Sequence, residues 1–147
     1  MYAPLREVST EFQDVMIALI RTLGLHQPDR TPCGQPVSVA ESHAVLELGR
    51  ESGLSQNALA ARLRLEKSSV SRIVTALERR GWVVRKRDLR DSRIVSVYLT
   101  DDGRDAAANL AASRRTKFER IFGAIPANER AAILSSLDTL VQAIRET

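Results

Sequence analysis

Residues 55–100 read SQNALAARLRLEKSSVSRIVTALERRGWVVRKRDLRDSRIVSVYLT, and this stretch decides the fold. Its first part has the pattern of a short helix with Ser55 as the N-terminal cap. A turn over residues 64–66 leads into a second helix over residues 67–80, which Gly81 ends. Two helices joined by so short a turn predict a helix-turn-helix, the usual DNA-reading unit.

The second of these helices has two distinct faces. One face is apolar at helical spacing and is expected to be buried: Val70, Ile73, Val74 and Leu77. The other face carries short hydroxyls and arginines: Ser68, Ser71, Arg72, Thr75 and Arg79. Small side chains let a helix approach base edges closely, and arginine can bind guanine O6 and N7 through two hydrogen bonds. The helix is therefore predicted to read the major groove.

The stretch after Gly81 predicts a β-hairpin with a basic tip. Residues 82–87 and 93–99 have the pattern of strands, and residues 88–92 that of a turn. Arginines at such a tip suit the minor groove or the flanking phosphates. Asp91 lies two residues from Arg93, so its carboxylate is expected to hold that guanidinium in place.

Charge is distributed unevenly along the chain. Residues 62–93 hold eleven basic and four acidic residues, a net charge of +7, whereas the rest of the chain holds eleven basic and fourteen acidic, a net charge of −3. Opposite signs in separate regions predict a polyanion-binding surface on an acidic body.

The flanking sequence is helical by its apolar periodicity. Helices are predicted over residues 8–23 and 38–50, separated by a loop over residues 27–36. Thr100 is expected to cap a long helix to residue 122, and a break over residues 125–129 precedes another apolar stripe over residues 133–144. The fold class is mainly α with a small β-hairpin.

Length and composition exclude several classes of protein. The chain of 147 residues is long enough for one domain with a real core, and it holds a single cysteine, Cys33. It contains no apolar run of membrane-spanning length, no signal-peptide pattern and no common catalytic motif, so we expect a cytoplasmic protein that is not an enzyme and needs no cofactor.

Two motifs resemble the MarR family of winged helix-turn-helix regulators. Asp91-Ser92-Arg93, then Leu99-Thr100 and Gly103, is similar to that family's wing signature. Residues 68–72 followed by residues 77–83 are similar to its recognition helix and the exit from it. The order of elements matches over nearly the whole chain. The resemblance implies a nucleoid-associated homodimer that binds a palindromic double-stranded DNA operator, usually a repressor released by a small molecule, an oxidant or a metal.

The resemblance also assigns expected roles along the chain. Residues 1–147 would be one MarR-like domain, with the DNA-binding lobe at 38–100 and dimerisation helices at 1–24 and 101–147. The DNA contacts would come from the recognition helix (Lys67, Ser68, Ser69, Ser71, Arg72, Thr75), from the wing (Arg87, Arg90, Asp91, Arg93) and, to phosphate, from Gln56 and Asn57. Glu66 departs from the family, in which Ser or Asp more often caps this helix, so the start of the helix is expected to be less firmly fixed.

Other readings remain open. His43 is expected to line an effector crevice. A redox switch at Cys33 is one alternative, and a metal site built from His26, His43, Cys33 and Glu41 is another, although their spacing matches no strong motif. A winged-helix module that binds protein instead of DNA is a third, but it would favour apolar residues where Ser68, Ser71 and Thr75 stand.

Overall fold

The computed structural model describes residues 4–147, so the first three residues of the predicted N-terminal segment 1–24 lie outside it. Its elements follow in the order α1 (Leu5–Leu23), α2 (Val39–Arg50), β1 (Leu54–Ser55), α3 (Gln56–Leu63), α4 (Lys67–Arg79), β2 (Val83–Arg87), β3 (Val95–Leu99), α5 (Asp101–Ala124), the short 3₁₀ helix η1 (Ala127–Glu129) and α6 (Arg130–Arg145). The predicted fold class, mainly α with a small hairpin, is confirmed.

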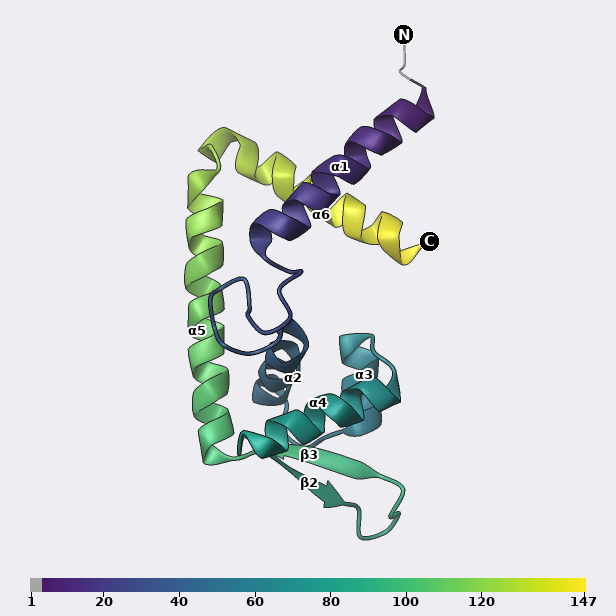
Figure 1. The fold of residues 1–147 in the computed structure, drawn as a ribbon, viewed down its shortest axis with the longest axis vertical. Helices are drawn as coiled ribbons and strands as arrows, with labels where there is room; N and C mark the ends of the chain where they lie inside the picture. The colour runs from purple at the N-terminus through teal and green to yellow at the C-terminus, as the bar shows by residue number, and fades with distance from the viewer. Residues whose placement is uncertain (1–3) are drawn as a thin grey trace.

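The elements form a lobe and a helical end joined by one long helix (Figure 1). The lobe contains α2, α3, α4 and the strands, and the hairpin of β2 and β3 extends beyond it. Helix α5 runs from this lobe to the other end of the molecule, where α1 and α6 lie. The helix-turn-helix and hairpin are therefore well separated in space from the N- and C-terminal helices.

The helix boundaries follow from local capping. The side chains of Ser38, Ser55 and Thr100 accept hydrogen bonds from backbone N–H groups in the first turns of α2, α3 and α5. Gly81 takes a φ of 78°, and the backbone N–H of Trp82 donates to the Leu77 carbonyl at 3.0 Å, which ends α4. At the other end of α4, Glu66 makes no side-chain capping bond. These features agree with the sequence predictions.

The sheet has one strand more than the sequence predicted. Its order is β1-β3-β2, and both pairs are antiparallel, with Leu54 opposite Val97 and Val83 opposite Leu99. Strand β1 consists of two residues, too few to show an alternating pattern, so it was missed. It ties the start of α3 to the base of the hairpin.

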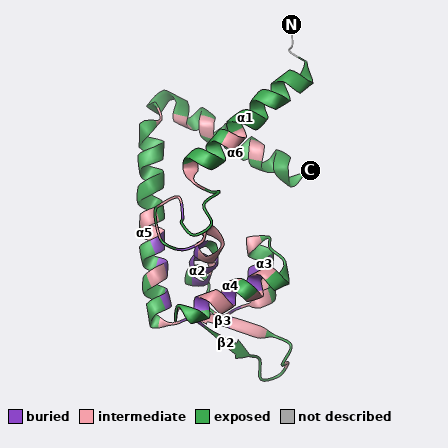
Figure 2. Cartoon of the chain, viewed as in Figure 1, coloured by how far each residue is buried: buried purple, intermediate pink, exposed green. Residues whose placement is uncertain are grey.

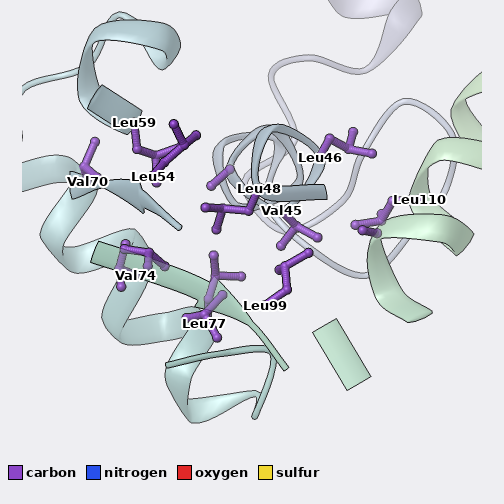
Figure 3. Packing of buried hydrophobic residues seen from close by; sticks show 14 of the residues in the cluster. Val45, Leu46, Leu48, Leu54, Leu59, Val70, Val74, Leu77, Leu99 and Leu110 are labelled. Atoms are coloured by element: carbon purple, nitrogen blue, oxygen red, sulfur yellow. The ribbon is translucent and has the colours of Figure 1, made fainter. Parts of the chain in front are cut away.

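The hydrophobic core lies almost entirely in the lobe. Apolar residues of α2, α4, the sheet and the first half of α5 pack together (Figure 3), and the side chains of Val45, Val70, Val74, Leu77 and Val97 are completely buried. In contrast, α1 and α6 contain no buried residue, and in Figure 2 both helices are green and pink with no purple. The lobe thus buries its hydrophobic core within one chain, whereas α1 and α6 do not.

No helix within residues 4–147 combines the length and the apolar character needed to cross a membrane.

Candidate nucleic-acid interface

Helix α4 lies on the surface of the lobe with most of its apolar face buried, although Ile73 of that face is only half-buried. Val70, Val74 and Leu77 pack into the core, as predicted (Figure 3). On the outer side, the side chains of Lys67, Ser68 and Arg72 are exposed. These three residues form an accessible cationic edge on the first half of the helix, while Ser69 is half-buried.

Two of the predicted DNA-contacting hydroxyls are already engaged inside the protein. Ser71 and Thr75 are half-buried, and the Thr75 hydroxyl donates to the Ser71 carbonyl at 2.9 Å. The Arg85 guanidinium, from β2, donates to the Thr75 hydroxyl at 3.1 Å and to the Ser71 carbonyl at 2.7 Å. This side of α4 therefore faces the hairpin.

Two residues at the start of α3, Gln56 and Asn57, were predicted to contact DNA phosphate, and they are in different environments. The Gln56 side-chain carbonyl accepts a hydrogen bond from Arg85 Nε at 2.7 Å and is half-buried. Asn57 is exposed and makes no side-chain hydrogen bond to residues 4–147. Asn57 is thus the more accessible of the two.

At the tip of the wing, Asp91 and Arg93 form the pair that the sequence predicted. Arg93 Nε lies 3.1 Å from Asp91 Oδ1, a terminal nitrogen of Arg93 lies 3.2 Å from Oδ2, and the Arg93 backbone N–H also donates to Oδ1. These hydrogen bonds from Arg93 hold the pKa of Asp91 below its ordinary value. The guanidinium, 90% exposed, is held at a fixed place on the surface.

The rest of the tip is ordered by two further contacts. The Asp88 carboxylate accepts backbone hydrogen bonds from Arg90 and Asp91 at 2.7 and 2.9 Å, which closes the turn. Arg87 donates to the Ser92 carbonyl at 3.1 Å and keeps the two strands together. The Arg90 side chain is exposed beside them.

The positive charge of residues 62–93 is partly neutralised away from this surface. Arg62 pairs with Glu47 and Glu51, and Arg80 pairs with Glu41. Within residues 4–147, no salt bridge involves the cationic edge residues Lys67 and Arg72 or the wing residues Arg87 and Arg90. Cations without a salt bridge thus include exposed residues of α4 and of the hairpin tip.

Arg85 is the residue of this region that the sequence reading missed. Strand alternation from the buried Val83 puts Arg85 on the same side of β2, toward α4, and that period was the available signal. This signal was missed because Arg85 is one of five basic residues between positions 85 and 93, all of which have the pattern of surface cations.

A cavity of about 200 Å³ lies between α2, α5 and the loop before α2. His43 lines it, together with Cys33 and the basic residues Arg114 and Lys117. The Cys33 thiol lies 2.9 Å from the Thr31 hydroxyl. Over residues 4–147, no three His, Cys, Asp or Glu side chains come together as metal ligands, so the structure does not assemble the alternative metal site.

Comparisons with known proteins agree with this arrangement. Residues 35–94 match the model of the MarR family. The HTH-type transcriptional regulator TtmR of Methylorubrum extorquens (strain PA1) is 42% identical over 60 residues, which cover 41% of this chain and 31% of TtmR. The match to this curated relative therefore spans about a third of that protein's length.

Solved structures share the fold over almost the whole chain. The PcaV transcriptional regulator of Streptomyces coelicolor superposes with a TM-score of 0.73 at 20% identity, covering 99% of this chain and 100% of PcaV. FabT of Streptococcus pneumoniae, solved in complex with DNA, gives a TM-score of 0.68 at 22% identity, covering 96% and 94% of the two chains. PcaV has also been solved in complex with its natural ligand.

At these identities the structural likeness establishes the fold alone. Residues 35–94 of this chain are similar to the MarR family of transcriptional regulators, and the chain has the winged-helix fold of the solved regulators.

Proposed function

We propose that the protein is a homodimeric repressor that binds a palindromic operator and releases it when a small molecule binds. In this proposal, residues 38–100 form the DNA-binding lobe, and residues 1–24 and 101–147 supply the dimerisation helices. Lys67, Ser68 and Arg72 enter the major groove, while Arg90 and Arg93 reach the minor groove or the phosphates beside it.

The observation that carries the proposal is the pairing of two exposed cationic features on one side of the lobe. The cationic edge of α4 and the Arg93 guanidinium, held by Asp91, are both exposed and lie on elements that the core joins rigidly. A recognition helix beside a wing is the arrangement that reads adjacent grooves of one duplex.

The apolar surface outside the lobe supports a dimer. Large apolar side chains on α1, the end of α5 and α6 are exposed: Val8, Phe12, Val15, Leu19, Phe118, Ile121, Phe122, Leu134, Leu137, Val141 and Ile144. Soluble monomers rarely leave so many large apolar side chains exposed on neighbouring turns of their helices. A two-fold axis through these helices would present two lobes to the two halves of a palindrome.

The cavity lined by His43 supports an effector of small size. It lies between α2 of the DNA-binding lobe and α5, which leads to the predicted dimer interface, so an occupant would act on the angle between the two. The PcaV relative binds a natural ligand. Apolar lining residues together with Arg114 and Lys117 favour a small organic anion.

Selection of bound sequences from random duplexes tests the DNA-binding proposal. The expected product is an inverted repeat whose half-sites are centred about one helical turn (10–10.5 bp) apart or a multiple of it. Binding should weaken with salt, with a slope of about −0.9 per phosphate contacted. Recovery of no common sequence, together with binding that does not respond to salt, would refute it.

Two substitutions separate the proposed roles of helix and wing. Arg93→Ala should weaken binding to the selected duplex and to random DNA by a similar factor, since a wing contact reads groove shape. Arg72→Ala should in addition reduce discrimination between the two duplexes by about 1–3 kcal/mol, the value of a two-bond base contact. Fluorescence anisotropy at one fixed salt concentration measures both effects, and equal losses of discrimination would contradict the assignment.

A further inference from the structure

Arg85 links three elements through one side chain. Its Nε donates to Gln56 at the start of α3, one terminal nitrogen donates to Thr75 and pairs with Glu78, and the other donates to the Ser71 carbonyl at 2.7 Å and its hydroxyl at 3.3 Å. The side chain is 26% exposed. A guanidinium has five N–H groups, and here almost all of them are used within the protein.

The acceptors on α4 form a single line along the helix. Ser71, Thr75 and Glu78 are spaced by four and three residues, so they share the flank of α4 that faces β2. This flank is distinct from the cationic edge of α4, which is exposed. Arg85 therefore lies between β2 of the hairpin and α4. Its guanidinium is bound within the protein and is not free to bind a DNA phosphate.

Few other contacts hold the wing against the helix. Val83 is buried at the base of the hairpin, but Val84 is 41% exposed and Lys86 turns to the opposite side, over the ring of Tyr98. Within residues 4–147, every side-chain hydrogen bond or ion pair between α4 and the strands β2 and β3 comes from Arg85. The core holds the base of the hairpin against α4, and Arg85 adds the polar contacts between that helix and the strands.

We propose that Arg85 is a positioning residue that sets the placement of the wing relative to the recognition helix, and so strengthens DNA binding without touching DNA. The inference rests on the proposed DNA-binding function. Two features that must enter adjacent grooves together bind best when their spacing is fixed in advance, because no ordering then has to occur on binding. Lysine in place of Arg85 keeps the charge but has a single nitrogen, which cannot reach α3 and all three acceptors on α4.

The test is a double-mutant cycle between Arg85→Lys and Arg93→Ala on the duplex that the wild-type protein selects from a random pool. In the wild-type background, Arg93→Ala should weaken binding about tenfold; in the Arg85→Lys background it should weaken it less than about threefold, because the wing is no longer held in its groove. Equal factors in both backgrounds would overturn the proposal.

Salt dependence separates positioning from direct contact with a phosphate. Arg85→Lys should weaken binding to the selected duplex about tenfold yet leave the slope of log K against log salt unchanged. Arg85→Gln should also leave that slope nearly unchanged, whereas a slope smaller by about 0.9 would show that Arg85 itself binds a phosphate and would overturn the proposal. Lys86→Gln is the matched control on the opposite side of the strand and should leave the effect of Arg93→Ala as in wild type.

A second variant guards against a folding defect. Thr75→Val removes one hydrogen-bond acceptor of the Arg85 guanidinium and keeps the side-chain volume, while Thr75→Ser keeps the hydroxyl. Thr75→Val should reduce the effect of Arg93→Ala in the same direction as Arg85→Lys, and Thr75→Ser should restore it; no difference between the two would count against the proposal. If the wild-type protein itself selects no duplex, the proposed DNA-binding function fails, an outcome distinct from an additive cycle.

Discussion

Gly103, a residue of the wing signature, lets the start of α5 pack closely against the backbone of Trp82. The backbone N–H of Thr100 donates to the Trp82 carbonyl at 2.9 Å, and this brings the first turn of α5 against the end of α4. A Cβ at position 103 would lie 1.9 Å from the same carbonyl oxygen. The L-T-x-x-G pattern is therefore a requirement of close backbone packing, which a side chain cannot meet.

Replacing Gly103 with alanine should destabilise the protein. The clash is with backbone, so α5 must move away from Trp82, at a cost of about 1–3 kcal/mol or more. Gly123→Ala is the matched control on the same helix, since a Cβ there meets nothing within 4 Å, and it should be neutral or stabilising by up to about 1 kcal/mol. Urea unfolding followed by circular dichroism measures both; equal stability of the two variants would contradict this account.

Asp91 should promote DNA binding although it is negatively charged. Asp91→Asn removes a charge that repels phosphate, but it also releases the Arg93 guanidinium, so we expect weaker binding at fixed salt. In the Arg93→Ala background the same substitution should cause no further loss. Tighter binding by Asp91→Asn, measured by anisotropy, would show that the repulsion outweighs the positioning.

The Asp91–Arg93 pair should also be insensitive to pH over the working range. Arg93 lowers the pKa of Asp91 from 3.8, so the carboxylate is ionised, and the pair complete, at every pH above the ordinary value. It is lost only as the pH falls through the lowered pKa. The factor by which Arg93→Ala weakens binding should therefore be constant between about pH 5 and pH 8, and a steep change across that range would contradict the assignment.

At the scale of the element, α4 has a well-capped C-terminus and an N-terminus without a side-chain cap. Gly81 closes its C-terminus with the Trp82 N–H bonded to the Leu77 carbonyl, whereas Glu66 caps nothing at the N-terminus. Lys67 adds a positive charge to a first turn where the helix dipole favours anions. In the proposed function, this end of α4 is less stable but carries a positive charge that suits contact with DNA phosphates.

Glu66→Asp should stabilise the protein by about 0.5–2 kcal/mol. The shorter side chain can accept from a backbone N–H of the first turn, and it keeps the charge that opposes Lys67. Glu66→Ala, which can form no cap, serves as the control and should not stabilise. The shift in the midpoint of denaturant unfolding, at an unchanged slope, measures the gain; no difference between the two variants would show that the start of α4 does not limit stability.

At the scale of the whole molecule, burial and exposure divide the chain into two parts. The lobe buries its core within one chain, while α1 and α6 leave their apolar faces in water (Figure 2). Helix α5 has 24 residues and spans about 36 Å at 1.5 Å per residue, enough to hold the lobe away from the helical end. A second copy bound at that end would set the spacing of the two recognition helices.

Leu137→Glu should therefore convert the proposed dimer into a monomer. Leu137 lies in the apolar stripe of α6 and is 45% exposed in one chain, and a carboxylate buried there without a partner is costly. Gln142→Glu adds the same charge to the other side of α6 and should leave the dimer intact. Sedimentation equilibrium at micromolar protein should give 16.3 kDa for Leu137→Glu and about twice that mass for the control and the wild type. A wild-type monomer would refute the dimer.

Much of the fold is determined by local signals in the sequence. The caps at Ser55 and Thr100, the glycine end at Gly81 and the apolar face of α4 all act within one or two turns, so pattern alone located these elements. The Asp91–Arg93 contact was equally predictable, because the two residues are neighbours in a turn.

The tertiary structure decided what depends on partners far away in the sequence. Strand β1 exists because β3 lies beside it, and Arg85 reaches Gln56, 29 residues earlier in the chain. The same contact network turned Ser71 and Thr75 toward the wing, although helical periodicity alone put them on the face with Arg72. Periodicity gives the direction of a side chain around its own helix, but which neighbour it meets is set by packing between elements, and only the folded chain brings those together.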